Sequence, residues 1–351
     1  MTPKISAGQT ACLLIISRII VSLTYSPSFF TGGYGSVDIL AFALTLPVTA
    51  LQFIPVLLLY KRGGSVVTVC YERSRTFGVA VAVSYALFLI WTASVTVARF
   101  DVFISTSVFS QYVFYGFMLP CVLAFFAALK GIEGIARASV AVVILIIAAV
   151  LLLFATGFSS FDTNNLLSFD YYGNGALFRS FLSSLSRSME AAILCVLLQF
   201  VKTKLRKACI IYMSVSFITV VLVLLTVILV IGDFSFITMF PYDSAAGNVS
   251  RWSFLDLEPL LIFVWIIGVF IKCSVCITLA AFCLEKIIKN IYVRSGVSAA
   301  LVMAISFALA RDIGGYPILF TPAVSLTLIA VFSFVLPIAA LVFGGKRCLK
   351  N

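Results

Sequence analysis

Long apolar runs separated by short polar segments make up almost the whole chain. An α-helix needs about 20 apolar residues to cross a hydrocarbon layer about 30 Å thick. The pattern predicts ten transmembrane helices, at 9–30, 36–60, 77–104, 112–129, 137–157, 176–201, 209–231, 257–284, 296–310 and 321–344. The predicted fold class is therefore an all-α integral membrane protein, and the lipid bilayer is treated as the solvent of the chain.

The composition supports this class. Of the 351 residues, 62% are hydrophobic and only 11% are charged, and the mean hydropathy is +1.18. Soluble globular domains are far less apolar than this. The net charge of +11 does not indicate nucleic-acid binding, because the basic residues form short clusters between apolar runs. No soluble extension is expected at either end, so residues 1–351 are expected to form one transmembrane domain.

The basic residues alternate from one side of the predicted membrane to the other. Seventeen of the 24 Lys and Arg residues fall in the segments of one side, whereas the other side holds only Arg251 and Arg311. Cytoplasmic segments carry an excess of positive charge, so both termini are predicted to be cytoplasmic. The outer segments 157–175 and 232–251 are rich in Gly, Ser, Asn and Asp, and they are expected to be loops.

Ten spans with both ends on one side allow two halves of five spans, about 9–157 and about 176–344. The second half then enters the membrane with the opposite orientation, which gives an inverted repeat. In such folds discontinuous helices line the substrate site. The span 176–201 suits this role, because a serine-rich polar half, expected to unwind, precedes an apolar half. In the first span a break is expected at 22–27, where Pro27 lacks a backbone donor.

Polar residues near these two breaks are the candidate ligand-binding residues. They are Ser22, Thr24, Ser26, Ser183, Ser184, Arg187 and Glu190. Glu190 lies roughly 18 Å from the basic end of its span at helical rise. An ionisable residue at that depth indicates a ligand site or a pathway. The serines have an alternative role, because small residues also permit close helix packing in membranes.

Two deep cations, Arg18 and Lys272, are candidates for ion coupling or for structural charge. Lys272 lies roughly 20 Å from either end of its span, so its ammonium could occupy the place of a coupling cation or exchange a proton. The alternative is a structural ion pair with Glu190 or a cage of backbone carbonyls. Arg18 could hold a ligand carboxylate or pair with Glu190. A local pair between Glu190 and Arg187 is a further alternative.

No motif for catalysis is present. The chain has no histidine, no phosphate-binding glycine loop, no nucleophile elbow and no pair of carboxylates spaced for acid–base chemistry. Cys273 and Cys276 form a CxxC pair, but no histidine and no second pair accompany it, so a metal site is not expected. We therefore predict a protein that is not an enzyme and uses no cofactor.

Several segments together resemble the GerAB-type B subunits of spore germinant receptors, within the amino acid–polyamine–organocation superfamily. They are KIS at 4–6 with Gln9, GIEGIAR at 131–137, DTNNLL at 162–167, and FVWI at 263–266 followed by KCS at 272–274. Their order covers nearly the whole chain. Ser26 and Pro27 stand where this family usually has a glycine-containing break.

The resemblance implies a LeuT-like fold with discontinuous helices 1 and 6, matching the inverted repeat. It also implies binding of a small germinant, often an amino acid, beside A-type and C-type receptor subunits in the spore inner membrane or bacterial cell membrane. The alternative function is a proton-coupled secondary transporter of amino acids or amines. A third possibility is a scaffold with no small ligand.

Overall fold

The computed structural model describes residues 4–23, 35–105, 113–166, 175–202, 204–252, 258–312 and 322–343. These residues are almost entirely helical. The membrane-spanning helices are α1 (Ala7–Leu23), α2 (Ser36–Lys61), α4 (Arg75–Phe103), α5 (Val113–Lys130), α6 (Ile132–Thr156), α7 (Ala176–Leu185), α8 (Glu190–Leu197), α9 (Leu205–Ile231), α11 (Glu258–Cys283), α12 (Ile291–Asp312), α13 (Pro322–Ile329) and α14 (Leu336–Phe343).

Each of the ten predicted spans coincides with a helix or with a pair of half-helices. Among the described residues, eight helical stretches are long and apolar enough to cross a membrane. The first span and the fourth are represented by shorter apolar helices, Ala7–Leu23 and Met118–Lys130. The sixth span consists of α7 and α8, and the tenth consists of α13 and α14 joined by the π-helical segment Ala330–Val335. The chain is an integral membrane protein.

Two short helices outside the spans did not follow from the hydrophobic pattern. The helix α3 (Val66–Arg73) connects the second and third spans, and α10 (Pro241–Trp252) connects the seventh and eighth. The expectation of a loop over 232–251 is therefore wrong along α10. Pro241 explains part of this, because proline at the first helical position loses no hydrogen bond and has the backbone angle a helix requires.

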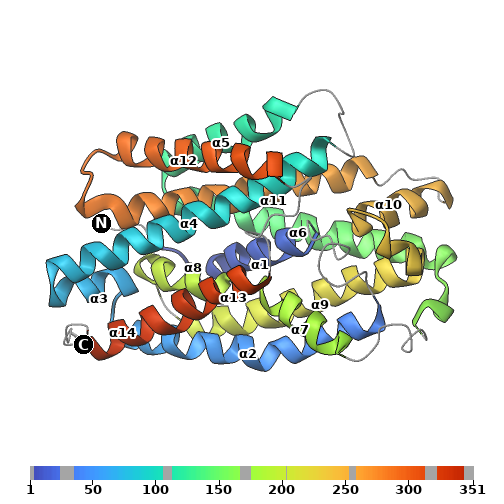
Figure 1. The fold of residues 1–351 in the computed structure, drawn as a ribbon, viewed down its shortest axis with the longest axis horizontal. Coiled ribbons are helices and arrows are strands. Elements are labelled where there is room, and N and C mark those ends of the chain that lie inside the picture. The colour runs from blue at the N-terminus through green and yellow to red at the C-terminus, as the bar shows by residue number, and fades with distance from the viewer. Residues whose placement is uncertain are drawn as a thin grey trace.

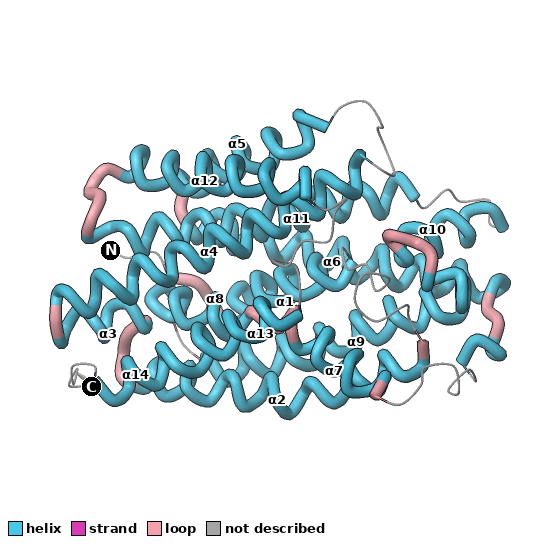
Figure 2. Tube along the Cα trace, viewed as in Figure 1, coloured by secondary structure: helices cyan, strands magenta, loops and turns pink. Residues whose placement is uncertain are grey.

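The helices form two groups with a central pair between them (Figure 1). In the upper group of this view α4 and α11 pack against α5 and α12, and in the lower group α2 packs against α7 and α9. Figure 2 shows that short loops join the helices at the two ends of the bundle. The described chain starts and finishes at the same end, where the N and C labels lie.

The central pair consists of α1 and α8. Every residue of α8 is buried, and α1 is buried along most of its length. The helix α1 packs against α6, α9 and α11, so it contacts both groups. A membrane helix shielded from lipid in this way can carry polar side chains without exposing them to hydrocarbon. The buried polar residues of these two helices can therefore face the protein interior.

The start of α1 is fixed to the end of the sixth span by backbone hydrogen bonds. Ile5 and Val201 form a parallel β-bridge, in which the Ile5 N–H donates to the Phe200 carbonyl at 2.8 Å. The Lys202 N–H donates to the Ile5 carbonyl at 3.0 Å. The Ile5 side chain is completely buried. This contact, which we call the inner bridge, joins the first and sixth spans at the end of the bundle where the chain begins.

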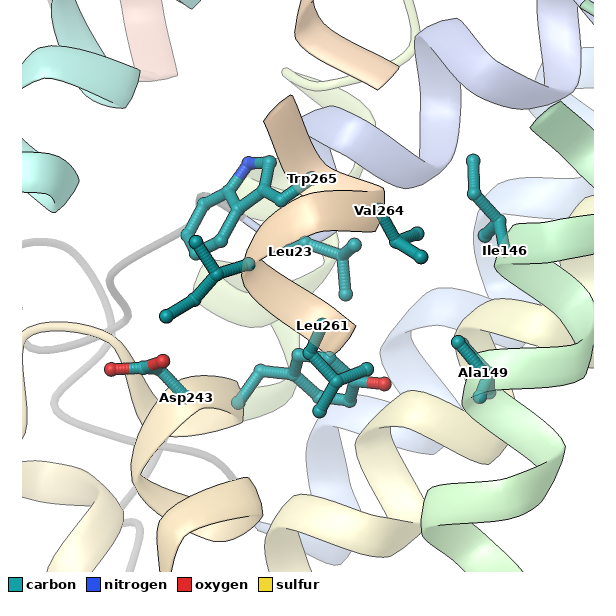
Figure 3. A pocket seen from close by; sticks show the side chains of 10 residues that line it. Leu23, Ile146, Ala149, Asp243, Leu261, Val264 and Trp265 are labelled. Carbon is teal, nitrogen blue, oxygen red and sulfur yellow. The ribbon is translucent and has the colours of Figure 1, made fainter. Parts of the chain in front are cut away.

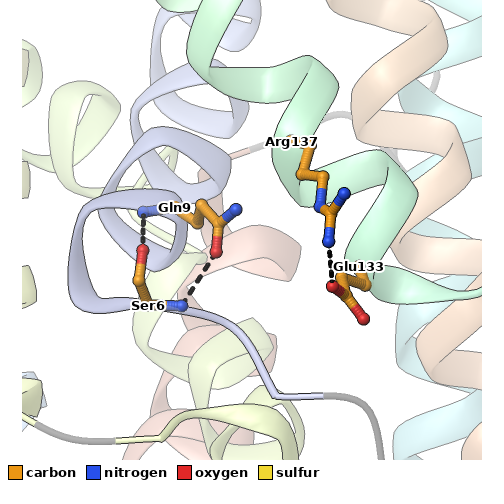
Figure 4. Close-up of polar contacts among 4 residues, drawn as sticks. All are labelled: Ser6, Gln9, Glu133 and Arg137. Atoms are coloured by element: carbon orange, nitrogen blue, oxygen red, sulfur yellow. Dashed lines mark hydrogen bonds and ion pairs between the residues drawn. The ribbon is translucent and has the colours of Figure 1, made fainter.

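Ser6 and Gln9 cap the first turn of α1 (Figure 4). The Ser6 N–H donates to the Gln9 side chain at 2.9 Å, and the Gln9 N–H donates to the Ser6 hydroxyl at 3.3 Å. This reciprocal pair is a capping box, which satisfies two backbone donors that a helix start would leave unpaired. Nearby, Arg137 pairs with Glu133 in the first turn of α6.

Replacing Ser6 with alanine is expected to reduce stability by about 1 kcal/mol, because a backbone donor in the first turn loses its acceptor. Thermal melting and amide exchange in the first turn of α1 would measure this loss. Ser84→Ala is the matched control, because its hydroxyl bonds only to the Ala80 carbonyl of its own helix. Equal losses for the two alanine variants, or no recovery with Ser6→Thr, would contradict the capping role.

Candidate functional site

The sixth span is interrupted at residues 186–189, between α7 and α8. Local side-chain bonds account for the interruption. The Ser186 hydroxyl donates to the Ser183 carbonyl at 2.7 Å, and the Arg187 Nε donates to the same carbonyl at 3.2 Å. Side chains that take backbone carbonyls in this way compete with the helical hydrogen bonds. The helix α7 therefore ends here, near the middle of the bundle.

Two arginines cap the end of α7. The Arg18 Nη2, from α1, donates to the Ser184 carbonyl at 3.3 Å, and the Arg187 Nη2 donates to the Ser184 hydroxyl at 3.0 Å. The last carbonyls of a helix have no partner within the helix, and positive charge is favourable at that end. Arg18 also lies over the Phe42 ring of α2, with its Cζ 5.3 Å from the ring centroid. The guanidinium of Arg18 thus connects α1 to the end of α7 at the break by a hydrogen bond.

Glu190 is the first residue of α8, on the other side of the break. A negative charge is favourable at a helix start, where backbone N–H groups are unpaired. Its side chain is 1% exposed, and its Oε2 accepts a hydrogen bond from the Tyr212 hydroxyl of α9 at 3.1 Å. Its other oxygen, Oε1, has no hydrogen-bond partner within the described part of the chain. The carboxylate therefore keeps one acceptor unsatisfied in the protein interior.

Lys272 connects α11 to α1. Its Nζ donates to the Ser17 carbonyl at 3.4 Å, and its side chain is 4% exposed. One helical turn earlier, Gly268 allows α1 to approach closely, because a Cβ at this position would lie 2.8 Å from the Cγ1 of Ile20. The ammonium is thus held against the backbone of the first span.

Glu190 is the carboxylate whose charge acts on both Arg18 and Lys272. In the part of the chain that the structure describes, neither cation forms a direct ion pair with it. The three charges therefore interact at longer range through a weakly polarisable interior, where electrostatic interactions are stronger than in water. Two cations share one carboxylate at the centre of the bundle.

The structure brings together most of the residues singled out from the sequence. Ser183, Ser184, Arg187 and Glu190 flank the break in the sixth span, as described above. The Ser22 hydroxyl donates to the Arg18 carbonyl at 3.1 Å near the end of α1. Thr24 and Ser26, with most of the predicted break at 22–27, lie outside the described residues.

A group of buried polar side chains on the second and seventh spans lies beside the break, and it was not identified from the sequence. In the break, the Ser188 hydroxyl lies 3.3 Å from that of Thr49 and donates to the Gln52 side chain at 3.5 Å. Gln52 is 1% exposed, although it lies in a long apolar helix. Tyr212 belongs to the same group. The available signal was the helical spacing of the hydroxyl groups of Tyr212, Ser216, Thr219 and Thr226, which places them on one face of α9.

Two small cavities adjoin the group. One, of about 20 Å³, lies between Arg18, Tyr212 and the break. The other, of about 10 Å³, lies beyond the end of α1, where side chains of α6, α10 and α11 converge (Figure 3). It is lined by Leu23, Trp265 and Tyr242 among others, and burial raises the pKa of the Tyr242 hydroxyl.

A cavity of 10–20 Å³ accommodates about one water molecule. Between the described residues the helices are thus packed closely around the break, and neither cavity has room for an organic ligand.

Two solved structures show a similar fold over almost the whole described chain. The chain is similar to MhsT, crystallised in complex with L-phenylalanine, with a TM-score of 0.64 and 11% sequence identity over 98% of this chain and 99% of that one. It is also similar to a Na⁺-coupled sialic acid symporter in a substrate-bound outward-open state, with a TM-score of 0.56 and 14% identity over 93% of this chain and 79% of that one. The fold is therefore LeuT-like, as the sequence predicted.

The family follows from the sequence itself. The model of the family described as spore germination protein, a family of spore permeases, matches residues 4–313. Because the match covers most of the 351 residues, the chain belongs to this family. A comparison with curated proteins gave no match. The resemblance that KIS at 4–6 and GIEGIAR at 131–137 suggested is thus confirmed. Both segments cap or pair at helix starts, as Figure 4 shows.

Proposed function

We propose that the protein is the germinant-sensing membrane subunit of a spore germination receptor. In this proposal a small nutrient such as an amino acid binds beside the break in the sixth span. The observation that carries the proposal is the break itself. Two half-helix ends meet there, with Arg18 and Arg187 at one and Glu190 at the other. Cationic and anionic groups placed together in this way are complementary to an amino acid carboxylate and ammonium.

The family and the fold support the same function. The family is one of spore germination proteins, and MhsT, which shares the fold, was crystallised with an amino acid. We place the ligand near Ser22, Ser183, Ser184, Arg187 and Glu190, with Thr24 and Ser26 from the first span. The chain would act with A-type and C-type receptor subunits in the spore inner membrane, with both termini cytoplasmic. The two halves, about 9–157 and 176–344, would form the inverted repeat.

A thermal-shift screen of the purified full chain against amino acids and amines tests the proposal. We expect one nutrient to raise the melting temperature saturably. Arg187→Gln should weaken this ligand about tenfold or more, because a hydrogen bond to a charged group is lost. Arg179→Gln is the matched control, because Arg179 belongs to the same span but is exposed, in α7. Absence of any ligand shift, or equal effects of both variants, would favour a scaffold without a small ligand.

One observation favours transport as the second candidate function. Lys272 holds its ammonium against the Ser17 carbonyl, between the first and eighth spans, as a bound coupling cation would. A lysine that released its proton there would couple flux to protons. Counterflow in proteoliposomes containing this subunit alone would support transport. Saturable binding without flux, together with loss of germination on deletion, would support sensing.

A further inference from the structure

The cavity of about 20 Å³ lies on the side of the break that faces α2 and α9. Its lining includes several polar side chains from four different spans. These are Arg18, Thr45, Thr49, Ser188, Tyr212 and Ser216. The rest of the lining is apolar, with Phe42 and Phe217 stacked at 5.7 Å between ring centroids. A few polar groups in an apolar wall are typical of a specific small-ligand site.

Two buried donors of this lining have no hydrogen-bond partner among the residues that the structure describes. They are the Arg18 Nη1 and the Ser216 hydroxyl. The other hydroxyls donate elsewhere. That of Thr49 donates to the Thr45 carbonyl at 2.9 Å, and that of Tyr212 donates to Glu190. A buried donor without an acceptor costs several kcal/mol at membrane depth. A hydrogen-bond acceptor bound in the cavity would therefore remove the free-energy cost of these two unpaired donors.

The charges around the cavity favour a negatively charged acceptor over a neutral one. Arg18 and Lys272 share the single carboxylate of Glu190, and Oε2 of that carboxylate is already bonded by Tyr212. Positive charge is therefore in excess around Arg18. A negative ion offsets this excess in a low-dielectric interior, whereas a neutral water molecule does not. The volume suits an ion of about the size of one water molecule and is too small for an amino acid with its carboxylate.

We infer that this cavity binds a small monovalent anion of the halide class, held by the Arg18 Nη1 and the Ser216 hydroxyl. The bound ion would connect α1 with α9 beside the break and would balance the second cation. This site shares Arg18 with the proposed nutrient site, but its lining includes Ser216 and neither Arg187 nor Glu190. Variants of Ser216 and of Arg187 therefore test the two inferences separately.

Melting of the purified full chain in chloride, bromide or gluconate, at constant sodium and ionic strength, tests the site. Halide should raise the melting temperature saturably, by an amount on the order of a few degrees at concentrations well above its dissociation constant. Ser216→Ala should weaken halide binding about tenfold, because a hydrogen bond to the anion is lost. The matched control is Thr219→Val on the same helix, whose hydroxyl bonds to the Val215 carbonyl at 2.8 Å. It should leave the halide effect unchanged.

Three results would overturn the inference. Equal melting in all salts would mean that the cavity holds water. Stabilisation by formate but not by halide would assign Arg18 to a ligand carboxylate. An unchanged halide effect in Ser216→Ala would place the ion elsewhere. Arg18→Gln removes a cap of α7 and can fail to fold, so crystals grown in bromide provide a second measurement. An anomalous peak within hydrogen-bond distance of Arg18 is expected, and a peak at other sites alone would contradict the proposal.

Discussion

Replacing Glu190 with glutamine is expected to destabilise the protein by about 3 kcal/mol, measured as the free energy of unfolding of the purified chain. The change preserves the size of the side chain and an acceptor for the Tyr212 hydroxyl. It removes the one negative charge that Arg18 and Lys272 share. Leaving buried cations without a counter-charge typically costs 3–5 kcal/mol. We expect the lower end of that range, because Glu190 contacts neither cation directly.

A double variant shows whether the loss of stability comes from the missing charge or from a change in packing. Glu190→Gln combined with Lys272→Met should lose less stability than the sum of the two single changes, by about 1 kcal/mol or more, because the second change removes one uncompensated cation. Glu133→Gln is the control. Its carboxylate pairs with Arg137 at the surface, where such pairs contribute about 0–1 kcal/mol. If Glu190→Gln cost no more than Glu133→Gln, Glu190 would be uncharged in the folded protein.

Replacing Gly268 with alanine is expected to lower the free energy of unfolding by about 1–3 kcal/mol, which is the second large effect. The new methyl group would lie 2.8 Å from the Ile20 Cγ1, so the Ile20 side chain has to shift or α1 has to move away from α11. The contact between Lys272 and Ser17 joins the same two helices one turn further on, and it would lengthen if the helices moved apart. We therefore expect weaker nutrient binding as well as a lower melting temperature.

The matched control for Gly268 is Gly134→Ala in α6. No heavy atom lies within 4 Å of the position that its Cβ would take, so this change should be neutral or slightly stabilising. A second substitution, Ile20→Ala, should recover part of the loss caused by Gly268→Ala, because it removes the atoms that collide. Strictly additive losses in this pair would show that close packing of α1 on α11 is not the reason for glycine.

The spans were predictable from the sequence because lipid imposes a simple rule. Every backbone group in the hydrocarbon layer must be satisfied, so each long apolar run must be a helix. The third span, expected at 77–104, is Arg75–Phe103, and the seventh, expected at 209–231, is Leu205–Ile231. The short helix α10 was missed because its Gly, Ser and Asn residues also suit loops, and a surface helix of 12 residues gives no apolar run.

The break in the sixth span lies in the serine-rich half that was expected to unwind and directly precedes Glu190. It is shorter than expected, because Ala176–Leu185 is helical and only residues 186–189 interrupt the span. Serine is compatible with a membrane helix when its hydroxyl bonds to a carbonyl of the preceding turn. What ends α7 is partly Arg18, which comes from a different span and reaches Ser184 across 166 positions of sequence. A partner so distant cannot be read from the segment itself.

Tyr212 was missed for a related reason. The role of its hydroxyl depends on the rotation of α9 about its axis, which places it against Glu190 and not against lipid. Apolar residues flank Tyr212 in the sequence, and the candidate residues were chosen for charge or for nearness to a break, so its hydroxyl was passed over. The spacing of Tyr212, Ser216, Thr219 and Thr226 places four hydroxyl groups on one face of α9, and all four residues are buried. The candidate charges were thus recognisable from depth, whereas their partners required the fold.

The inner bridge between Ile5 and Val201 has a mechanical consequence for how the bundle can open. If α1 alone swung away at this end, the two backbone bonds at 2.8 and 3.0 Å would be broken and the Ile5 side chain would be exposed. If α1 and α8 tilted together, both bonds would survive. The bridge therefore ties the first span to the sixth at this end of the bundle. A displacement of α8 that preserved both bonds would carry the start of α1 with it, so the two spans would move as one unit.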